Sequence, residues 1–317
     1  MSFNPFSADP EIRSRQERLA QSIGTALKGE IVELLSAPRR GAGANDGGVL
    51  PKQEADALIS RYALAGVEDL MLLALQPAQD YARPPISRFF VGAVGLERET
   101  GNLVLGGNME FPAGHLGFTV HGEGFVLTRA ASRGTTISHL AISEAHPCAH
   151  CRQYLSEFAA TRDMILIDPL GHRLTMAQLY PWPFDPGYLG EAGYVPGARH
   201  ERSLAANDLP APTATALLDA ACRAHAPYSK CPGAVVLTLS DGNLVTGFAI
   251  ESVAFNPTMG PLQAALIDLS ANGYAAADIT AAALACMPGA DVDYSASTAE
   301  LLAAVAPGIP LTIIGLT

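Results

Sequence analysis

Two short stretches of the sequence hold residues whose types and spacing could do chemistry. TVHGEG contains His121 and Glu123, and HPCAHC contains Cys148 and Cys151. Zinc binds thiolate sulfur at roughly 2.3 Å and imidazole nitrogen at roughly 2.0–2.1 Å, in a tetrahedral shell. Cysteines three positions apart on a helix lie on one face, so both sulfurs can reach one ion. With His121 as the third ligand, the fourth position stays open, as in catalytic zinc sites.

Glu123 indicates what an open zinc position would do. Residues two apart in mid-helix point about 200° apart, but at the first turn, where the chain enters the helix, they can converge on one site. Zinc lowers the pKa of a bound water from 15.7 to about 7, so hydroxide exists at neutral pH. A neighbouring carboxylate can take the proton and return it to a leaving amine. Pro147 favours a helix that begins near Cys148, where unpaired N–H groups stabilise thiolates.

Each of these residues also has a simpler interpretation. A lone C-x-x-C pattern is often a redox pair or a coincidence. Other nearby histidines are candidate ligands by composition alone, although a lone histidine is more often a surface or core residue: His115, His139, His146 and His150. The combination of H-x-E with a later P-C-x-x-C is more specific, because it is the known signature of zinc nucleobase deaminases.

The elements around these stretches begin with helices. Asp9-Pro10-Glu11 is typical of a helix start, and apolar residues at helical spacing carry that helix toward Ala37. The stretch 38–52 is predicted to be a loop by its Gly, Asn and Pro content. A second helical segment is expected from about Glu54 through Leu75.

Further along the chain, β-rich runs alternate with helical stretches. Strands are expected at 89–94 and 102–109, joined as a hairpin, and at 164–169. Helices are expected in TVHGEGFVLTRAAS and in PCAHCRQYLSEFAAT. Strands that alternate with helices favour an α/β layer fold.

An internal repeat relates the two halves of the chain. PISRFFVGAV returns loosely as PYSKCPGAVV, and each copy continues into a strand, a turn and a second strand. Gly92 and Gly106 are 14 positions apart, as are Gly233 and Gly247. Two unrelated hairpins with a similar turn are the alternative, but a duplicated domain explains more of the pattern. We expect an N-terminal helical segment (1–60), a catalytic zinc domain (61–181), a linker (182–211) and a degenerate, non-catalytic second domain (212–317).

The composition narrows the class of protein. The 317 residues suffice for about two domains, and 49% of them are hydrophobic. Only 16% are charged, which favours self-association. A net charge of −11 without a basic run argues against nucleic-acid binding. The N-terminus lacks an apolar leader, no apolar run reaches the roughly 18 residues of a membrane span, and five cysteines fit free thiols or ligands in a reducing cytoplasm.

Taken together, the motifs resemble the cytidine deaminase family, specifically its larger, two-domain homodimeric branch. The resemblance rests on FxVGA, GGNMEF, TVHGE and PCAHCRQ in the first half, and on PYSK and AFNPT in the second. It implies a three-layer cytidine-deaminase-like α/β fold, duplicated, with an N-terminal helical segment. It also implies a hydrolase that deaminates cytidine and 2′-deoxycytidine to the uridines and ammonia in pyrimidine salvage.

The resemblance further implies roles for particular residues. It implies one Zn²⁺ per subunit on His121, Cys148 and Cys151, with Glu123 as proton shuttle. Among substrate contacts, Asn108 and Glu110 fall where the family binds the ribose hydroxyl, Phe89 where a ring stacks on the pyrimidine, and Gly122 where its backbone can donate and accept. Phe89 has the alternative of a core strand residue. Gly122 and His146 depart from the family pattern, which usually has alanine and a small polar residue there.

The second copy lacks these residues. Aligning the repeat with one residue slipped puts Gln263 at the place of His121, Ala265 at Glu123, Ala249 at Asn108 and Cys231 at Phe89. No C-x-x-C follows, so the second domain is expected to be structural. In the resembled branch, the loop carrying AFNPT reaches the partner's site, which makes Ala254 and Phe255 candidates for contacts in trans.

Two other functions remain open from the sequence. A base deaminase acting on RNA or DNA is disfavoured by the net charge, and Asn108 with Glu110 favours the sugar of a free nucleoside. A non-catalytic, zinc-stabilised binding scaffold is disfavoured by Glu123, because a structural site needs no such carboxylate. The expectation is a small-molecule nucleoside substrate, no nucleic-acid or membrane partner, and a cytoplasmic homodimer.

Overall fold

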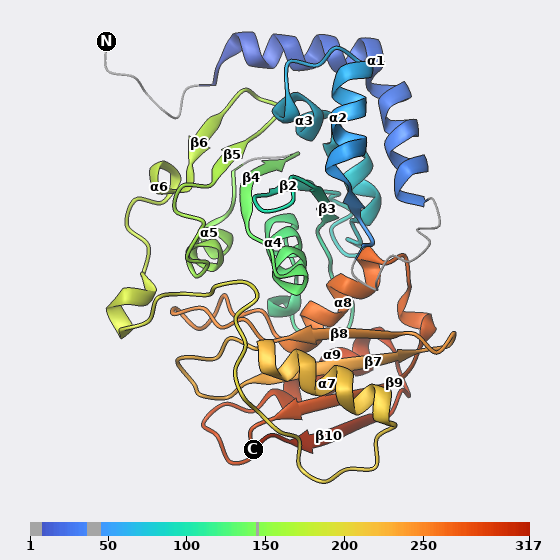
Figure 1. The fold of residues 1–317 in the computed structure, drawn as a ribbon, viewed down its shortest axis with the longest axis vertical. Helices are drawn as coiled ribbons and strands as arrows, with labels where there is room; N and C mark the ends of the chain where they lie inside the picture. Colours follow the sequence, from blue (N-terminus) through green and yellow to red (C-terminus); the bar gives the residue numbers. More distant parts are fainter. Residues whose placement is uncertain (1–7, 37–45, 144–145) are drawn as a thin grey trace.

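The computed structural model describes residues 8–36, 46–143 and 146–317, and it contains one β-sheet in each half of the chain (Figure 1). The first sheet has the strand order β1-β3-β2-β4-β5-β6 and the second has β10-β9-β7-β8. No helix among the described residues has the length and apolar character needed to cross a bilayer.

The N-terminal helix forms as predicted. α1 (Pro10–Ser36) is capped by Asp9, whose Oδ1 accepts the backbone N–H of Glu11 at 2.8 Å. Leu27 and Ile31 are fully buried on its inner face. Residues 37–45, which include just over half of the predicted loop 38–52, lie outside the described residues. The remainder of that loop contains the short strand β1 (Val49–Leu50).

The prediction of one helix from Glu54 through Leu75 is wrong, because two helices occupy this region. α2 (Lys52–Arg61) ends before Ala63, which adopts a left-handed φ of 49°, and α3 (Val67–Ala78) follows. Asp69, 2% exposed, accepts the N–H of Ala65 at 3.1 Å and also binds the side chains of Arg15 and Gln16 from α1. The break between α2 and α3 therefore allows Asp69 to form buried hydrogen bonds that connect α1 with the start of α3.

The first sheet is built around the predicted hairpin. β2 (Gly92–Glu97) pairs antiparallel with β3 (Leu103–Gly107) and, on its other side, with β4 (Ile137–Ile142), a strand that the sequence pattern did not predict. β4 continues in parallel with β5 (Ile165–Ile167), within the predicted buried strand, and β6 (Arg173–Thr175) closes the edge.

Helices cover both faces of this sheet, which gives the expected three layers. A Cβ at Gly92 would lie 2.3 Å from the carbonyl oxygen of Leu75 in α3, and a Cβ at Gly106 would lie 2.2 Å from the ring of Phe125 in α4 (Gly122–Arg133). Both helices therefore approach the sheet closely, from opposite faces. α5 (Ala149–Ser156) packs beside α4, and α6 (Met176–Leu179) follows β6.

The second half repeats this plan without the N-terminal helices. α7 (Ala211–Arg223) precedes the hairpin of β7 (Gly233–Leu239) and β8 (Leu244–Phe248), which α8 (Pro261–Ala271), β9 (Ile279–Cys286), α9 (Tyr294–Val305) and β10 (Leu311–Gly315) follow in turn. β9 pairs antiparallel with β7 and parallel with β10, as β4 does with β2 and β5. The prediction of a duplicated fold is confirmed.

The segment predicted as a linker packs against both halves. The ring of Tyr194, 2% exposed, lies 5.2 Å from the ring of Phe158 and 5.2 Å from that of His225. His225 Nε2 and the Tyr228 hydroxyl both bond Glu157 Oε1, at 2.7 and 2.8 Å, and the N–H of Val253 donates to Glu157 Oε2. A fully buried carboxylate at the end of α5 thus receives its hydrogen bonds from the second half.

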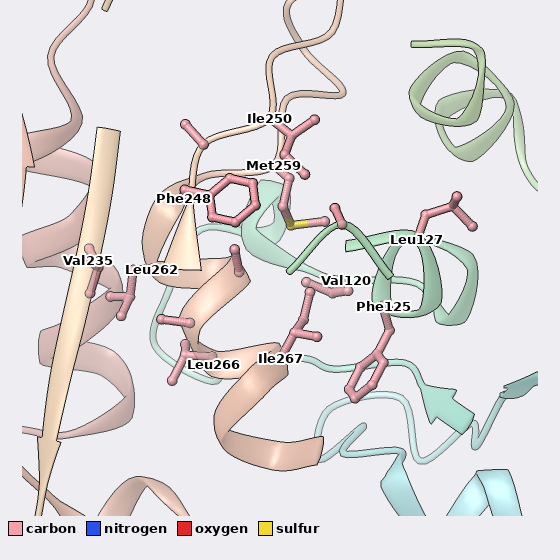
Figure 2. Packing of buried hydrophobic residues seen from close by; sticks show 14 of the residues in the cluster. Val120, Phe125, Leu127, Val235, Phe248, Ile250, Met259, Leu262, Leu266 and Ile267 are labelled. Atoms are coloured by element: carbon pink, nitrogen blue, oxygen red, sulfur yellow. The ribbon is translucent and has the colours of Figure 1, made fainter. Parts of the chain in front are cut away.

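The two halves also share a hydrophobic core. α4 and α8 pack against each other, and Figure 2 shows Val120 and Phe125 of the first half beside Ile267 of α8. The core extends to Met259, Leu262 and Val235, which belong to the second half (Figure 2). The second half therefore completes the packing around the helix that begins at His121.

Candidate metal centre and its pocket

Two helix starts bring His121, Cys148 and Cys151 together. His121 is the N-cap residue of α4, and Cys148 is the N-cap residue of α5. α5 therefore begins at Ala149, one position later than Cys148. His121 Nδ1 lies 3.5 Å from Cys148 Sγ and 3.3 Å from Cys151 Sγ. Cys148 Sγ also accepts the N–H of Cys151 at 3.4 Å, so the first turn of α5 stabilises a thiolate there.

The three donor atoms fit a zinc ion. They lie within 4.8 Å of one another, and the donors of a tetrahedral zinc with bonds of about 2.0–2.3 Å lie roughly 3.3–3.8 Å apart. The donor set of one imidazole and two sulfurs is the soft set that zinc prefers. Among the described residues, no fourth His, Cys, Asp or Glu donor joins this group, so a fourth position is left for water or substrate.

The two cysteines have opposite electrostatic tendencies before metal binds. Hydrogen bonds from the Cys151 thiol and from His121 lower the pKa of Cys148 to about 3. The Cys148 thiolate and burial raise the pKa of Cys151. One sulfur is therefore already a thiolate, and the second loses its proton when a dication binds.

Glu123 lies in the first turn of α4, where the chain enters the helix. Its side chain is 5% exposed, and burial raises the pKa of its carboxyl, against the opposing effects of its backbone N–H and His121. His121 and Glu123 both line the same pocket, so the first-turn convergence expected for residues two apart occurs here. A buried carboxylate whose pKa is raised is suited to accepting and releasing a proton.

The pocket at this centre has a volume of about 530 Å³. All of its lining residues belong to the first half of the chain, and the predicted residues Phe89, Asn108, Glu110 and Gly122 are among them. Ser87 also lines the pocket, and the sequence analysis did not predict it. Its signal was the repeat itself, because Pro-x-Ser recurs as PIS and PYS in the two copies.

Asn108 and Glu110 hold the pocket wall and keep spare hydrogen-bonding capacity. Asn108 Nδ2 donates to the carbonyl of Phe89 at 2.8 Å and its Oδ1 accepts the N–H of Val91 at 2.9 Å, which leaves one N–H and one lone pair. Glu110 Oε2 accepts the N–H groups of Ile86 and Ser87, both at 2.8 Å. Although desolvation opposes it, hydrogen bonds from Ser87 and Ile86 hold the pKa of Glu110 below its usual value.

Phe89 is not a core strand residue. Its side chain is 56% exposed, it precedes β2, and it lines the pocket. Phe90 is also exposed, at 51%, but it is not among the pocket-lining residues. The simpler interpretation of Phe89 as part of the core is therefore wrong, and its ring is free to meet a ligand.

Gly122 is explained by close packing on β2. A Cβ at this position would lie 3.0 Å from the Cβ of Ala93, which is fully buried. An alanine would need Ala93 to shift by a few tenths of an ångström. The departure from the pattern of the resembled family therefore has a steric reason in this chain.

The other histidines near the motif bind elsewhere. His115 Nδ1 accepts the N–H of Gly117, His139 Nε2 lies 3.6 Å from Glu68, and His150 Nε2 lies 3.2 Å from the carbonyl oxygen of Asn256. His146 lines the pocket, but its ring nitrogen faces Asp168. None of the four belongs to the group formed by His121 and the two cysteines.

Ala254 and Phe255 lie outside the pocket of their own chain. Phe255 is 61% exposed, has a left-handed φ of 62°, and its ring lies 6.2 Å from that of Tyr228.

The sequence alignment of the second copy needs correction. Met109 bridges to Val120 and Ile250 bridges to Met259, so Gly260, not Gln263, corresponds to His121 as the N-cap residue. Leu262, not Ala265, then corresponds to Glu123. The loop before α8 is shorter than the loop before α4, and the alignment had not allowed for this.

The contacts of the hairpins agree with the other two predicted correspondences, Cys231 with Phe89 and Ala249 with Asn108. Ser229 Oγ accepts the N–H of Cys231 as Ser87 Oγ accepts that of Phe89, so Cys231 stands at Phe89. Ala249, next to Ile250, stands at Asn108. The strand register places Ala234, not Gly233, at Gly92, because the hairpin turn of the second copy is one residue shorter.

Comparisons with known proteins match both halves. The family model for the cytidine and deoxycytidylate deaminase zinc-binding region matches residues 66–167, and a second model of the same description matches residues 192–299. A cytidine deaminase of Photobacterium profundum is 34% identical over 277 residues, which cover 86% of this chain and 90% of that protein. Cytidine deaminase 1 of Arabidopsis thaliana is 34% identical over 249 residues, 71% of this chain and 82% of that protein.

A solved structure of a cytidine deaminase from Mycobacterium leprae matches 36% of this chain and 98% of its own chain, with 26% identity and a TM-score of 0.33. The family models and the full-length relatives carry the conclusion, since they span both halves. The chain belongs to the cytidine deaminase family, whose zinc-binding region it contains.

Proposed function

We propose that the protein deaminates cytidine and 2′-deoxycytidine hydrolytically, giving uridine or 2′-deoxyuridine and ammonia. The observation that carries the proposal is the position of Glu123, a buried carboxylate in the pocket that His121 and Cys148 line, two of the three clustered donors. The names of the relatives support the same reaction.

The residues of the site have different roles in this reaction. Zinc, held by His121, Cys148 and Cys151, would lower the pKa of a bound water. Glu123 would take a proton from the attacking water, whose oxygen bonds to C4 of the pyrimidine, and the two water protons would end on ring N3 and on the amino nitrogen, which leaves as ammonia when the C4–N bond breaks. Burial of the carboxylate keeps its pKa above the usual value, so it is a stronger base toward the water proton than an exposed glutamate.

The pocket wall orients the substrate. The exposed ring of Phe89 is placed to stack on the pyrimidine. The spare N–H of Asn108 and the Glu110 carboxylate can bond a ribose hydroxyl as donor and acceptor. The backbone of Gly122 lies at the same wall.

The experiment is a cytidine absorbance assay with zinc analysis on the same sample. We expect uridine and ammonia from cytidine and deoxycytidine, one catalytic zinc per chain, and no ammonia from cytosine in oligonucleotides. Deamination of the oligonucleotides alone would favour a nucleic-acid base deaminase. Bound zinc without any turnover would favour a structural scaffold.

We also propose that the protein works as a homodimer in the cytoplasm, in pyrimidine salvage, and that Ala254 and Phe255 contact the partner's pocket. The low charge content and the exposed Phe255 support this assembly. An Ala254→Arg subunit mixed with a His121→Ala subunit tests the contact. The mixed dimer should regain one working site, since the His121→Ala subunit supplies a normal loop to the intact centre. Activity no higher than that of the Ala254→Arg homodimer would exclude the contact in trans.

A further inference from the structure

A second group of potential ligands lies beside the catalytic pocket. His146, Asp168 and His172 each offer one donor atom, and these atoms lie within 4.8 Å of one another. His146 Nδ1 is 3.6 Å and His172 Nδ1 is 2.8 Å from Asp168 Oδ2, and the two imidazole rings meet edge to face with centroids 4.6 Å apart. His146 also lines the catalytic pocket.

The carboxylate of this group is buried without a permanent counter-charge. Asp168 is 3% exposed, and its Oδ1 accepts the N–H groups of Leu170 and His172 at 2.9 and 3.1 Å. Among the described residues, no lysine or arginine forms an ion pair with it, and its side-chain neighbours at Oδ2 are the two imidazoles. A buried carboxylate is costly unless it is paired or coordinates a metal.

The geometry of the group is close to that of a metal site. Donor atoms around an ion with bonds of about 2.0–2.2 Å lie roughly 3–3.5 Å apart, so His146 would move slightly toward Asp168 and His172 slightly away from it. Two imidazoles with one carboxylate are a donor set that zinc, nickel and copper bind, whereas magnesium and calcium prefer oxygen donors alone. The side chains of His146 and His172 are 29% and 18% exposed, which leaves the group open to solvent.

We propose that His146, Asp168 and His172 form a second binding site for a divalent transition-metal ion, zinc above all, beside the catalytic centre. It is separate from the His121 centre, since the two groups share no ligand. Its ion is held without thiolates, so it exchanges more readily than the catalytic zinc. Binding requires His172 to free Nδ1 by moving its proton to Nε2, which leaves the Asp168 carboxylate to the ion.

Equilibrium dialysis of the full-length protein against buffered free zinc, followed by metal analysis, tests the site directly. We expect the wild type to bind two zinc ions per chain and the His172→Gln variant to bind one. Glutamine keeps a hydrogen-bond donor near Asp168 but offers no imidazole. If His172→Gln fails to fold, His146→Gln answers the same question, because it removes a ligand from the other end of the group.

The matched control is His139→Gln. His139 is also a partly buried histidine next to a carboxylate, that of Glu68 at 3.6 Å, but it belongs to neither group. It should keep both ions, and magnesium or calcium should not replace the second one. A wild type that saturates at one zinc, or a second zinc that survives both glutamine variants, overturns the proposal. Because the readout is metal content, an inactive protein that still binds the second ion would leave this inference standing.

Discussion

The two halves of the molecule keep the same framework and differ in the residues that do chemistry. In the first half, Glu110 accepts hydrogen bonds from the Ser87 hydroxyl and from two backbone N–H groups. In the second half, Glu251 accepts the same set from the Ser229 hydroxyl and from the backbone N–H groups of Tyr228 and Ser229. At the helix starts, however, His121 and Glu123 are replaced by Gly260 and Leu262. The hydrogen bonds around the glutamate are therefore present in both halves, whereas the histidine and the glutamate at the helix start are present only in the first.

The thiolates are replaced in the same way. Cys148 is the N-cap residue of α5, and Asp293 is the N-cap residue of the corresponding helix α9. Ala296 lies three residues after Asp293, as Cys151 lies three residues after Cys148, so these two positions correspond. The second half keeps a capping group at this helix start, because a helix needs one, but it keeps no pair of sulfurs.

Where the halves meet, corresponding positions face each other. Arg129 of α4 and Asp268 of α8 are 139 positions apart, the same separation as His121 and Gly260, and they form a buried ion pair of 2.9 Å. Ser132 donates to the same carboxylate oxygen at 3.0 Å. Two identical subunits would bring like residues together here, whereas the duplicated chain can place opposite charges. The second half thus contributes packing and charge to the helix of the first.

Among the variants that test this comparison, one that removes a cysteine sulfur should have the largest effect on zinc content and activity. We expect Cys151→Ser to lose zinc and at least roughly 100-fold in activity, because oxygen is a poorer ligand at a site that two thiolates and one imidazole define. Ala296→Ser, at the corresponding and exposed position of the second half, should change neither. Metal analysis and the cytidine assay measure both variants, and a zinc content of Cys151→Ser equal to that of the wild type would remove Cys151 from the ligand set.

Glu123→Gln should have the next largest effect. The amide cannot carry the proton, so we expect a loss of roughly 10²–10⁴-fold in kcat with zinc retained. Leu262→Met in the second half is the control, and it should leave kcat unchanged because it conserves the volume of a buried side chain. A Glu123→Gln variant with near-normal kcat would assign the proton transfer to another group.

Asp268→Asn tests the contact between the halves. It leaves the Arg129 guanidinium buried without its counter-charge, so the free energy of unfolding should fall by about 3–5 kcal/mol. The exposed pair of Arg199 and Asp219 provides the control, and Asp219→Asn should cost about 0–1 kcal/mol. Denaturant unfolding measures both, and equal costs would mean that the buried pair contributes no more than a surface pair.

The sequence predicted what depends on local patterns. Asp9 at a helix start, the zinc-type spacing of Cys148 and Cys151, and the hairpin around Gly101 are set by neighbours in the chain, and the structure contains each of these features. The internal repeat predicted the duplication, and the resemblance to a family supplied the three-layer fold; the comparisons confirm both.

The features that the sequence did not predict depend on distant contacts. The break between α2 and α3 follows from the contacts of Asp69 with α1, and the ion pair of Arg129 joins positions 139 apart. The correspondence of His121 with Gly260 was missed because the shorter loop of the second copy becomes evident only from strand pairing. Phe89 was ambiguous because exposure cannot be read from an apolar residue type alone.

The smallest effect is expected from variants of Glu110 and Glu251, the corresponding glutamates of the two halves. Glu251→Gln weakens charge-assisted hydrogen bonds in a side chain that is 3% exposed, and should lower the free energy of unfolding by about 1.5–3 kcal/mol without changing the KM for cytidine. Glu110→Gln loses equivalent bonds but also lines the pocket, so its KM should rise about tenfold, which corresponds to 1.4 kcal/mol. If both variants change stability alone, Glu110 has only a structural role, as Glu251 does, and Asn108 makes the ribose contact without it.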